Sequence, residues 1–258
     1  MNQNSIAHTD EGKGLPVVLI HAFPLNRRMW SLQVSVLRDR FRMITVDLRG
    51  HGDSASVPVA DSVDDFALDV REVLDRLSIR KAVLVGLSMG GYTAFACYRC
   101  FPDRVEALVL SDTRAQSDSA ETRAGRVSMI QIAESKGADA IADIMLPRLL
   151  SPASLQKPEL SESLRAMIKH TPIGTIKADL KAMADRPDST PLLGTIRCPT
   201  LVLVGELDGS TPPSDARFIA QNIPEAHLQV ISNAGHLPNI EQPSAFNNTL
   251  ASFLQTLS

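Results

Sequence analysis

Gly86, Ser88 and Gly90 form a G-x-S-x-G pattern, which continues into a further glycine, Gly91. The pattern follows the apolar run Ala82–Val85 and precedes a helical pattern, so the serine is expected in a tight turn between a strand and a helix. Such a turn needs glycine on both sides, because side chains there would collide. The hydroxyl would stand exposed beside the N–H groups of a helix N-terminus, which favour negative charge. We therefore predict that Ser88 is a nucleophile.

A serine hydroxyl needs a base to become nucleophilic, and the base needs an acid to orient it. His236, one of six histidines, lies just after the apolar run Leu228–Ile231, and Asp208 lies just after the run Thr200–Val204. Loops at the carboxyl ends of parallel strands assemble at one edge of a sheet, so these side chains are expected to converge. The chain order Ser88, Asp208, His236 is also typical of a nucleophile in this kind of turn. The sequence thus predicts a Ser-His-Asp triad for acyl transfer.

Asp112 is the rival acid, because it follows the apolar run Val105–Leu110 and also ends a strand near Ser88. Its neighbours, a serine and a threonine, are more typical of a turn that closes the core. Chain order favours Asp208 over Asp112.

Backbone N–H groups are expected to hold the oxyanion that forms when the serine attacks. Met89 supplies one of them, because it directly follows the nucleophile. Phe23, in the loop His21–Pro24 after an early apolar run, should supply the other. Taken alone, this loop also fits an ordinary turn at the end of a strand.

Other chemistries find little support in the sequence. A metal centre would need a pattern such as H-E-x-x-H or clustered Cys and His, so neither a metal nor an organic cofactor is expected. Cys97 and Cys100 match C-x-x-C, but they lie inside the expected helix rather than at its start, where the helix dipole lowers a thiol pKa. We interpret the three cysteines as ordinary thiols in a reducing compartment.

Charge and hydropathy exclude several classes of partner. The net charge is −3 and Lys and Arg form no stripe, which argues against nucleic acid or an acidic membrane surface. The longest apolar runs, such as Val17–Ile20, are far too short to span a bilayer, and the polar N-terminus lacks the apolar core of a signal peptide. We expect a cytoplasmic protein that acts on a small molecule, and the sequence does not indicate its oligomeric state.

Short apolar runs alternate with helical patterns and must position these side chains. Most of the runs lack polar alternation, which is typical of strands buried on both faces of a parallel sheet. The predicted strands are Leu15–Ile20, Met43–Val46, Ala82–Val85, Val105–Leu110, Thr200–Val204 and Leu228–Ile231. A weaker pattern around Ile6–Thr9 fits an edge strand. The predicted fold class is α/β, with a mostly parallel, doubly wound sheet.

The alternation stops after the fourth of these runs, where helical stripes replace strands. Asp118 and Glu121 are interpreted as a capping pair that opens the first helix. The stripe that this helix is expected to bury consists of Ala124, Val127, Ile130 and Ala133. Prolines such as Pro147 punctuate the stretch. We predict an all-helical cap over residues 113–190, inserted into an α/β core of residues 1–112 and 191–258.

Five motifs together resemble the α/β-hydrolase superfamily over essentially the whole chain. They are His21-Ala-Phe-Pro24, Asp47-Leu-Arg-Gly-His-Gly52, Gly86-Leu-Ser-Met-Gly-Gly91, Gly205-Glu-Leu-Asp208 and Gly235-His236. The core resembles the branch of 3-oxoadipate enol-lactonases and small carboxylesterases, in which a helical cap follows the sixth strand. The resemblance implies the same triad, the same two oxyanion donors and no cofactor. Two departures are Ala22, where glycine is usual, and a short N-terminus that leaves little room for the usual first strand.

The expected function is hydrolysis of a small carboxylic ester through an acyl-enzyme, with Met145 and Leu146 of the cap lining the substrate pocket. One alternative is a 3-oxoadipate enol-lactonase or related lactonase, whose doubly acidic substrate would need a cation under the cap. Its possible sources are Arg114, Arg126 and Arg148. Further alternatives are a C–C bond hydrolase, a cofactor-free haloperoxidase-like enzyme, and a non-catalytic ligand receptor.

Overall fold

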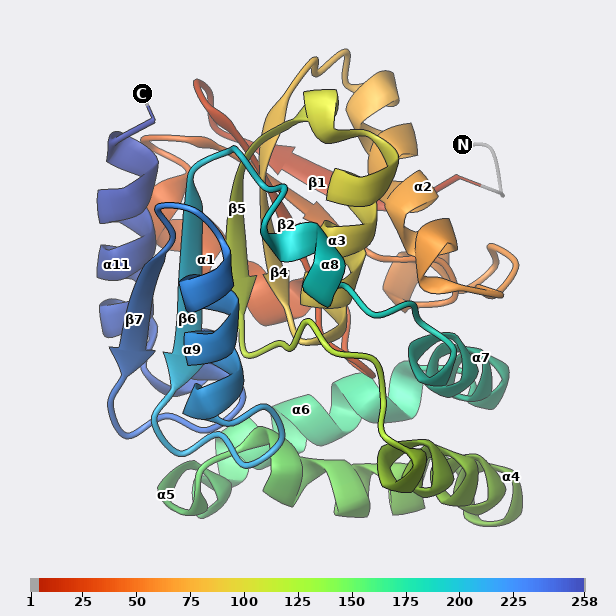
Figure 1. The fold of residues 1–258 in the computed structure, drawn as a ribbon. Coiled ribbons are helices and arrows are strands. Elements are labelled where there is room, and N and C mark those ends of the chain that lie inside the picture. Colours follow the sequence, from red (N-terminus) through yellow and green to blue (C-terminus); the bar gives the residue numbers. More distant parts are fainter. Residues whose placement is uncertain (1–4, 258) are drawn as a thin grey trace.

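Seven strands form one sheet at the centre of the structure, a computed structural model that describes residues 5–257 (Figure 1). They are β1 (His8–Glu11), β2 (Pro16–Ile20), β3 (Arg42–Val46), β4 (Ala82–Leu87), β5 (Val105–Ser111), β6 (Thr200–Gly205) and β7 (His227–Ile231). Their order across the sheet is β1-β3-β2-β4-β5-β6-β7. β1 is antiparallel to β3, and the other neighbouring strands are parallel. The predicted α/β fold class is confirmed.

The burial of the strands explains why the sequence displays them so clearly. Every residue of β4 and β6 is buried, as expected for central parallel strands covered on both faces. The six predicted runs coincide with β2–β7 to within two residues at either end. The weak edge pattern predicted at Ile6–Thr9 corresponds to β1, which begins two residues later, at His8. Its residues are only partly buried, so the sequence pattern there is faint.

Helices cover both faces of the sheet. α1 (Ser31–Leu37) packs on α11 (Pro243–Gln255), whereas α2 (Val63–Arg76) packs on α3 (Met89–Cys100) and α9 (Pro213–Asn222) packs on β6. Ser62 and Asp65 form a capping box that starts α2. Shorter segments are α10 (Pro238–Glu241) and the 3₁₀ helices Arg27–Trp30, Gly52–Ser54 and Pro102–Arg104.

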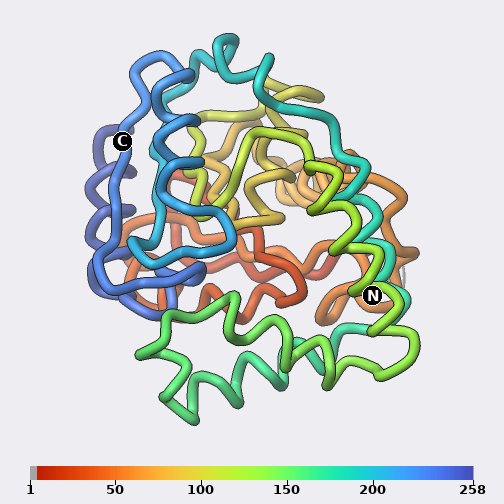
Figure 2. The backbone as a smooth tube through the Cα atoms, turned by 60° about the horizontal axis from the view of Figure 1, so that its bottom comes forward, coloured from red at the N-terminus to blue at the C-terminus, as the bar shows by residue number. Residues whose placement is uncertain are grey.

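The segment between β5 and β6 contains helices and no strand among the described residues. These inserted helices are α4 (Ala120–Leu149), α5 (Pro152–Leu155), α6 (Pro158–His170), α7 (Ile173–Ala184) and α8 (Thr190–Leu193). α4 to α7 lie across the edge at which the parallel strands end (Figure 1), and they arch around the strand ends in Figure 2. No helix within residues 5–257 is long and apolar enough to cross a membrane.

Helix α4 differs from the prediction in three details. Its cap is Ser119, whose hydroxyl accepts a hydrogen bond from the N–H of Thr122, because Asp118 is instead buried and bound by arginines. Its break lies at Gly137, where φ is 78°, since Pro147 fits within the last turns of the helix. Ala124 and Val127 are exposed, whereas the buried residues of this part of α4 are Met129 and Ala133. The helix therefore presents a narrower apolar face than the stripe suggested.

Candidate active site

Ser88 stands in a sharp turn between β4 and α3, with φ 57° and ψ −112°. A Cβ atom on Gly86 would lie 2.1 Å from the carbonyl oxygen of Gly90, and one on Gly90 would lie 2.2 Å from a carbonyl oxygen of β2. The turn is tied to the next strand, because the Ser88 N–H donates to Ser111 O (2.9 Å) and the Thr113 hydroxyl donates to Ser88 O (2.9 Å). Glycine is therefore required on both sides of the serine for steric reasons.

His236 and Asp208 form a buried pair in the loops that follow β7 and β6. The distance between His236 Nδ1 and Asp208 Oδ2 is 2.8 Å. Because a carboxylate only accepts hydrogen bonds, Nδ1 is the donor of this bond, and in the neutral form of the ring the lone pair is then on Nε2. The imidazole is thus held in the form that can act as a base.

Asp208 is surrounded by donors. Its carboxylate accepts hydrogen bonds from the N–H groups of Ser210 (2.8 Å) and Thr211 (3.1 Å) and from the Thr211 hydroxyl (2.6 Å). Burial alone would raise its pKa, but the charge and hydrogen bond of His236 and the hydrogen bonds of Thr211 outweigh burial and hold the pKa below its usual value. Asp208 therefore stays charged. Sequence reasoning missed Thr211, which is recognisable only once the loop is folded.

Asp112, the rival acid, lies at the end of β5 but hydrogen bonds elsewhere. Its Oδ1 accepts from the Gly205 N–H (2.8 Å) and its Oδ2 accepts from the Ser111 hydroxyl (2.6 Å). Burial and then the charge of Asp208 raise the pKa of Asp112 well above its usual value, which favours its neutral form. One ligand atom each of Asp112, Asp208 and His236 lies within 4.8 Å of the others, but both carboxyl groups are already engaged in these hydrogen bonds.

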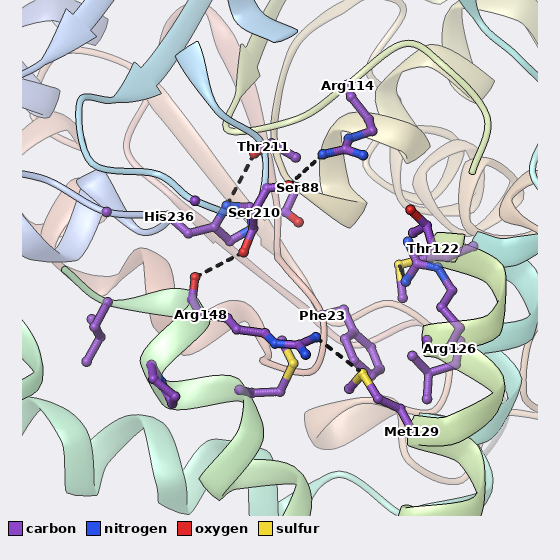
Figure 3. A pocket seen from close by; sticks show the side chains of 18 of the residues that line it. Phe23, Ser88, Arg114, Thr122, Arg126, Met129, Arg148, Ser210, Thr211 and His236 are labelled. Atoms are coloured by element: carbon purple, nitrogen blue, oxygen red, sulfur yellow. Dashed lines mark hydrogen bonds between the residues drawn. The ribbon is translucent and has the colours of Figure 1, made fainter. Parts of the chain in front are cut away.

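A cavity of about 1030 Å³ lies between the strand ends and the inserted helices. Ser88, His236 and Phe23 line it, and Figure 3 shows Ser88 and His236 at the same end. Met145 lines the cavity as predicted. Leu146 does not, because it is buried on another side of α4, about 100° around the helix from its neighbour.

Phe23, one of the two predicted oxyanion donors, lines this cavity, and the other, Met89, directly follows Ser88 in the chain. The Met89 N–H is the first of α3, so it has no acceptor within the helix. Phe23 follows β2 in a loop that His21 fixes: His21 Nε2 accepts from the Leu48 N–H (3.1 Å), and Nδ1 lies 3.1 Å from the Ala22 carbonyl oxygen, to which it donates. Burial, followed by the nearby His51, lowers the pKa of His21 well below its usual value, so the ring is neutral.

Ala22 is fully buried, and its N–H donates to Met29 Sδ (3.3 Å). The methyl group that replaces the usual glycine hydrogen is thus accommodated inside the core.

Glu241 is a buried acid that sequence reasoning missed. Its Oε1 accepts from the N–H groups of Gly235 (2.7 Å) and Leu237 (3.4 Å), on either side of His236. Its Oε2 accepts from the N–H of Ser151, which precedes α5 (2.8 Å). One carboxylate thus joins the histidine loop to the inserted helices. Because Ser151 is ninety residues away in sequence, no local pattern announces this contact.

Three arginines line the cavity (Figure 3). Arg114 lies 3.1 Å from the carboxylate of Asp215 and also donates to Ser210 O. Arg126 is paired with Asp118, which Arg186 binds as well. Arg148 contacts Met129 Sδ at 3.9 Å.

A second buried pair joins the core to α7. His51 Nε2 lies 2.7 Å from Asp179 Oδ2, and both side chains are fully buried. The nearby Thr175 hydroxyl donates to Gly50 O (3.1 Å). His51 belongs to the Asp47–Gly52 motif, and its partner in α7 could not be identified from sequence.

The C-x-x-C pair lies in the last turns of α3, as expected. Cys97 is buried and Cys100 is exposed, and neither forms a disulfide. Burial raises the pKa of Cys97 well above its usual value, which is the opposite of a redox-active thiol.

Known proteins resemble this chain over most of its length. The family model described as alpha/beta hydrolase fold matches residues 16–243. The curated 3-oxoadipate enol-lactonase 2 of Acinetobacter baylyi is 29% identical over 241 residues, which cover 93% of this chain and 88% of that protein. A thermophilic esterase from Thermogutta terrifontis superposes with a TM-score of 0.94 and 42% identity, over 98% of this chain and 93% of that one. The enol-lactonase from Burkholderia xenovorans LB400 gives 0.90 and 30%, over 98% of both chains.

Proposed function

Because the chain belongs to the α/β hydrolase fold family and is a hydrolase, we propose that it cleaves small carboxylic esters by acyl transfer to Ser88. The observation that carries the proposal is the His236–Asp208 pair, whose imidazole lines the same cavity as the Ser88 hydroxyl. A neutral imidazole held by a charged carboxylate is the base that a serine nucleophile requires.

In the proposed first step, His236 Nε2 takes the hydroxyl proton while Ser88 Oγ attacks the ester carbonyl. The N–H groups of Phe23 and Met89 hold the resulting oxyanion. When the tetrahedral intermediate collapses, the imidazolium returns its proton to the leaving alcohol and an acyl-serine remains. In the second step His236 deprotonates a water molecule, which attacks the acyl-serine. The second tetrahedral intermediate then collapses as the imidazolium returns its proton to Ser88 Oγ, and the carboxylic acid leaves.

The inserted helices act as a cap in this proposal, with residues 113–190 over a core of 1–112 and 191–258. They form the wall of the cavity opposite the strand ends, so bound substrate would be partly shielded from bulk water. The substrate is a small molecule, since the nucleophile lies inside this cavity rather than on an open face.

A lactone is the second candidate substrate, because it is a cyclic ester and the same steps open its ring. The enol-lactonases among the relatives, and the arginines that line the cavity, favour this possibility.

Replacement of Ser88 tests the proposal. Ser88→Ala should lower the rate of hydrolysis of 4-nitrophenyl butyrate roughly 10⁴- to 10⁶-fold, because no nucleophile remains, while circular dichroism stays unchanged. Ser128→Ala, which removes an exposed hydroxyl of α4, is the matched control and should keep the rate. A fluorophosphonate should label wild-type protein at Ser88, as judged by peptide mass spectrometry. Near-normal turnover by Ser88→Ala, or labelling at another residue, would contradict the assignment.

A further inference from the structure

The hydroxyl of Thr211 lies between the two members of the His236–Asp208 pair. Thr211 Oγ1 donates to Asp208 Oδ2 (2.6 Å) and lies 3.3 Å from His236 Nδ1, which itself lies 2.8 Å from the same carboxylate oxygen. These three atoms form a closed triangle, in which the hydroxyl contacts both the acid and the ring that the acid holds. A residue in this position can fix the two groups relative to each other.

Thr211 also binds the other oxygen of the carboxylate. Its backbone N–H donates to Asp208 Oδ1 (3.1 Å), so one residue contacts both oxygens. Thr211, Asp208 and His236 are all buried, so bulk water competes little for these bonds. Because hydrogen bonds to a charged carboxylate are strong, Thr211 opposes rotation of the Asp208 side chain.

A competing partner explains why this restraint matters. The Asp112 carboxyl, whose neutral form is favoured, carries a proton that it can donate, and it lies close to both Asp208 and His236. If the Asp208 carboxylate turned to accept a hydrogen bond from Asp112, His236 Nδ1 would lose its acceptor. The contacts of Thr211 keep Oδ2 of Asp208 facing the imidazole.

The backbone holds Thr211 itself in place. Thr211 precedes Pro212 and Pro213, and the second proline starts α9. A residue before proline is restricted to extended conformations, and a β-branched side chain has few rotamers. The hydroxyl is therefore positioned before a substrate binds.

We propose that Thr211 is a positioning residue, whose hydroxyl holds the Asp208 carboxylate against His236 so that Nε2 is directed toward the Ser88 hydroxyl. This inference rests on the proposed function. Thr211 acts through Asp208 and His236 and needs no contact with the substrate. Its contribution is therefore expected in kcat rather than in KM.

Removal of the hydroxyl alone tests the proposal. Thr211→Val keeps the shape of the side chain and should lower kcat for 4-nitrophenyl butyrate about 10- to 100-fold, with KM changed less than about threefold. Thr211→Ser restores the hydroxyl and should bring kcat back to within about threefold of the wild type. Thr249→Val removes a hydroxyl that donates to a carbonyl oxygen of its own helix, α11, and should leave both constants unchanged. Circular dichroism and urea unfolding check that each variant is folded.

A spectroscopic measurement tests the same contact without a substrate. The proton NMR resonance of the His236 Nδ1–H group is identified by its absence in His236→Asn. It should move upfield or broaden in Thr211→Val, because the bond to Asp208 becomes longer and less aligned. It should stay near its wild-type position in Thr211→Ser and in Thr249→Val.

The proposal is wrong if Thr211→Val keeps the kcat of the wild type, or if Thr211→Ser is as slow as Thr211→Val, since packing rather than the hydroxyl would then set the rate. A change confined to KM, or an unchanged or downfield resonance in Thr211→Val, would likewise reject it. A failure of the proposed function would look different. In that case the wild type would not hydrolyse esters, or Ser88→Ala would hydrolyse them, while the resonance would still report on the contact of Thr211.

Discussion

Two buried imidazole–carboxylate pairs lie on opposite sides of β2, and their nitrogen–oxygen distances are nearly the same. His236 Nδ1 lies 2.8 Å from Asp208, and His51 Nε2 lies 2.7 Å from Asp179. They differ in what the remaining atoms face. The second nitrogen of His236 is left free beside a cavity, whereas Nδ1 of His51 and Oδ1 of Asp179 are buried without a hydrogen-bond partner among the described residues. A short His–Asp distance is therefore common to both pairs, and what sets His236 apart, and supports its proposed role as a base, is that its imidazole lines the cavity.

The two carboxylates also differ in how their charge is stabilised. Donors from Thr211 and the charge of His236 overcome the effect of burial on Asp208, so its pKa falls. Burial dominates at Asp179, where only His51 opposes it, and the pKa of Asp179 rises. The surroundings of Asp208 thus stabilise its charged form. The His51–Asp179 pair instead connects the inserted helix α7 to the core, although burial disfavours the charge of Asp179.

The same substitution in each imidazole should give opposite results. His236→Asn should lower kcat about 10⁴-fold or more, because the base is lost, with little effect on unfolding. His51→Asn should lower the free energy of unfolding while the rate falls far less. The measurement is ester hydrolysis beside urea unfolding for both variants. Comparable losses of activity in the two would show that the pairs are not functionally distinct.

Removal of one partner from the enclosed pair should destabilise the protein. Asp179→Ala should lower the free energy of unfolding by about 3 kcal/mol, because it leaves the buried His51 without an acceptor. The double variant His51→Leu, Asp179→Leu should lose less than the single one, since no polar group is then left unpaired. Urea unfolding of the three proteins measures both values. A double variant less stable than Asp179→Ala would argue that packing, not polar pairing, limits this site.

The smallest expected effect is on the pH dependence of stability. Folding lowers the pKa of Asp208, so its ionised carboxylate stabilises the folded protein. This contribution to the free energy of unfolding is present above the usual pKa of 3.8 and is lost as pH falls through the folded-state pKa. Folding raises the pKa of Asp179, so its protonated form is the one favoured in the folded protein. Its contribution to the free energy of unfolding is present below 3.8 and is lost as pH rises through the folded-state pKa. The destabilisation caused by Asp208→Asn should therefore shrink on acidification, and that of Asp179→Asn should shrink as pH rises. Urea unfolding at several pH values checks both signs, and parallel pH profiles would contradict the contrast.

The contrast between the pairs also marks how far the sequence could be interpreted. The strands were predictable because central parallel strands are continuously apolar. The serine turn was predictable because it tolerates only glycine at two positions, where a Cβ atom would lie 2.1–2.2 Å from a carbonyl oxygen. The pairing of His236 with Asp208 was predictable because each residue lies in the loop that follows a strand. Asp179 and Glu241 follow no such rule. Each lies in a helix, and its partner is fixed only by tertiary packing.

The inserted helices were the least predictable part for the same reason. The apolar stripes predicted where helices form but not which element packs against each helix face. Val127 was therefore expected to be buried, whereas it is 54% exposed. The guanidinium of Arg148 could not be distinguished from those of Arg114 and Arg126. Asp215, which pairs with Arg114, is distant in sequence, and Asp118, which pairs with Arg126, was interpreted as a helix cap.

Glu241 has a mechanical consequence for how ligands come and go. Its two oxygens hold the backbone on both sides of His236 and, at the same time, the first residue before α5. Lifting α5 away would strip this carboxylate of one donor and loosen its hold on the histidine loop. A movement of α5 that admits a ligand is thus coupled through Glu241 to the loop that carries His236.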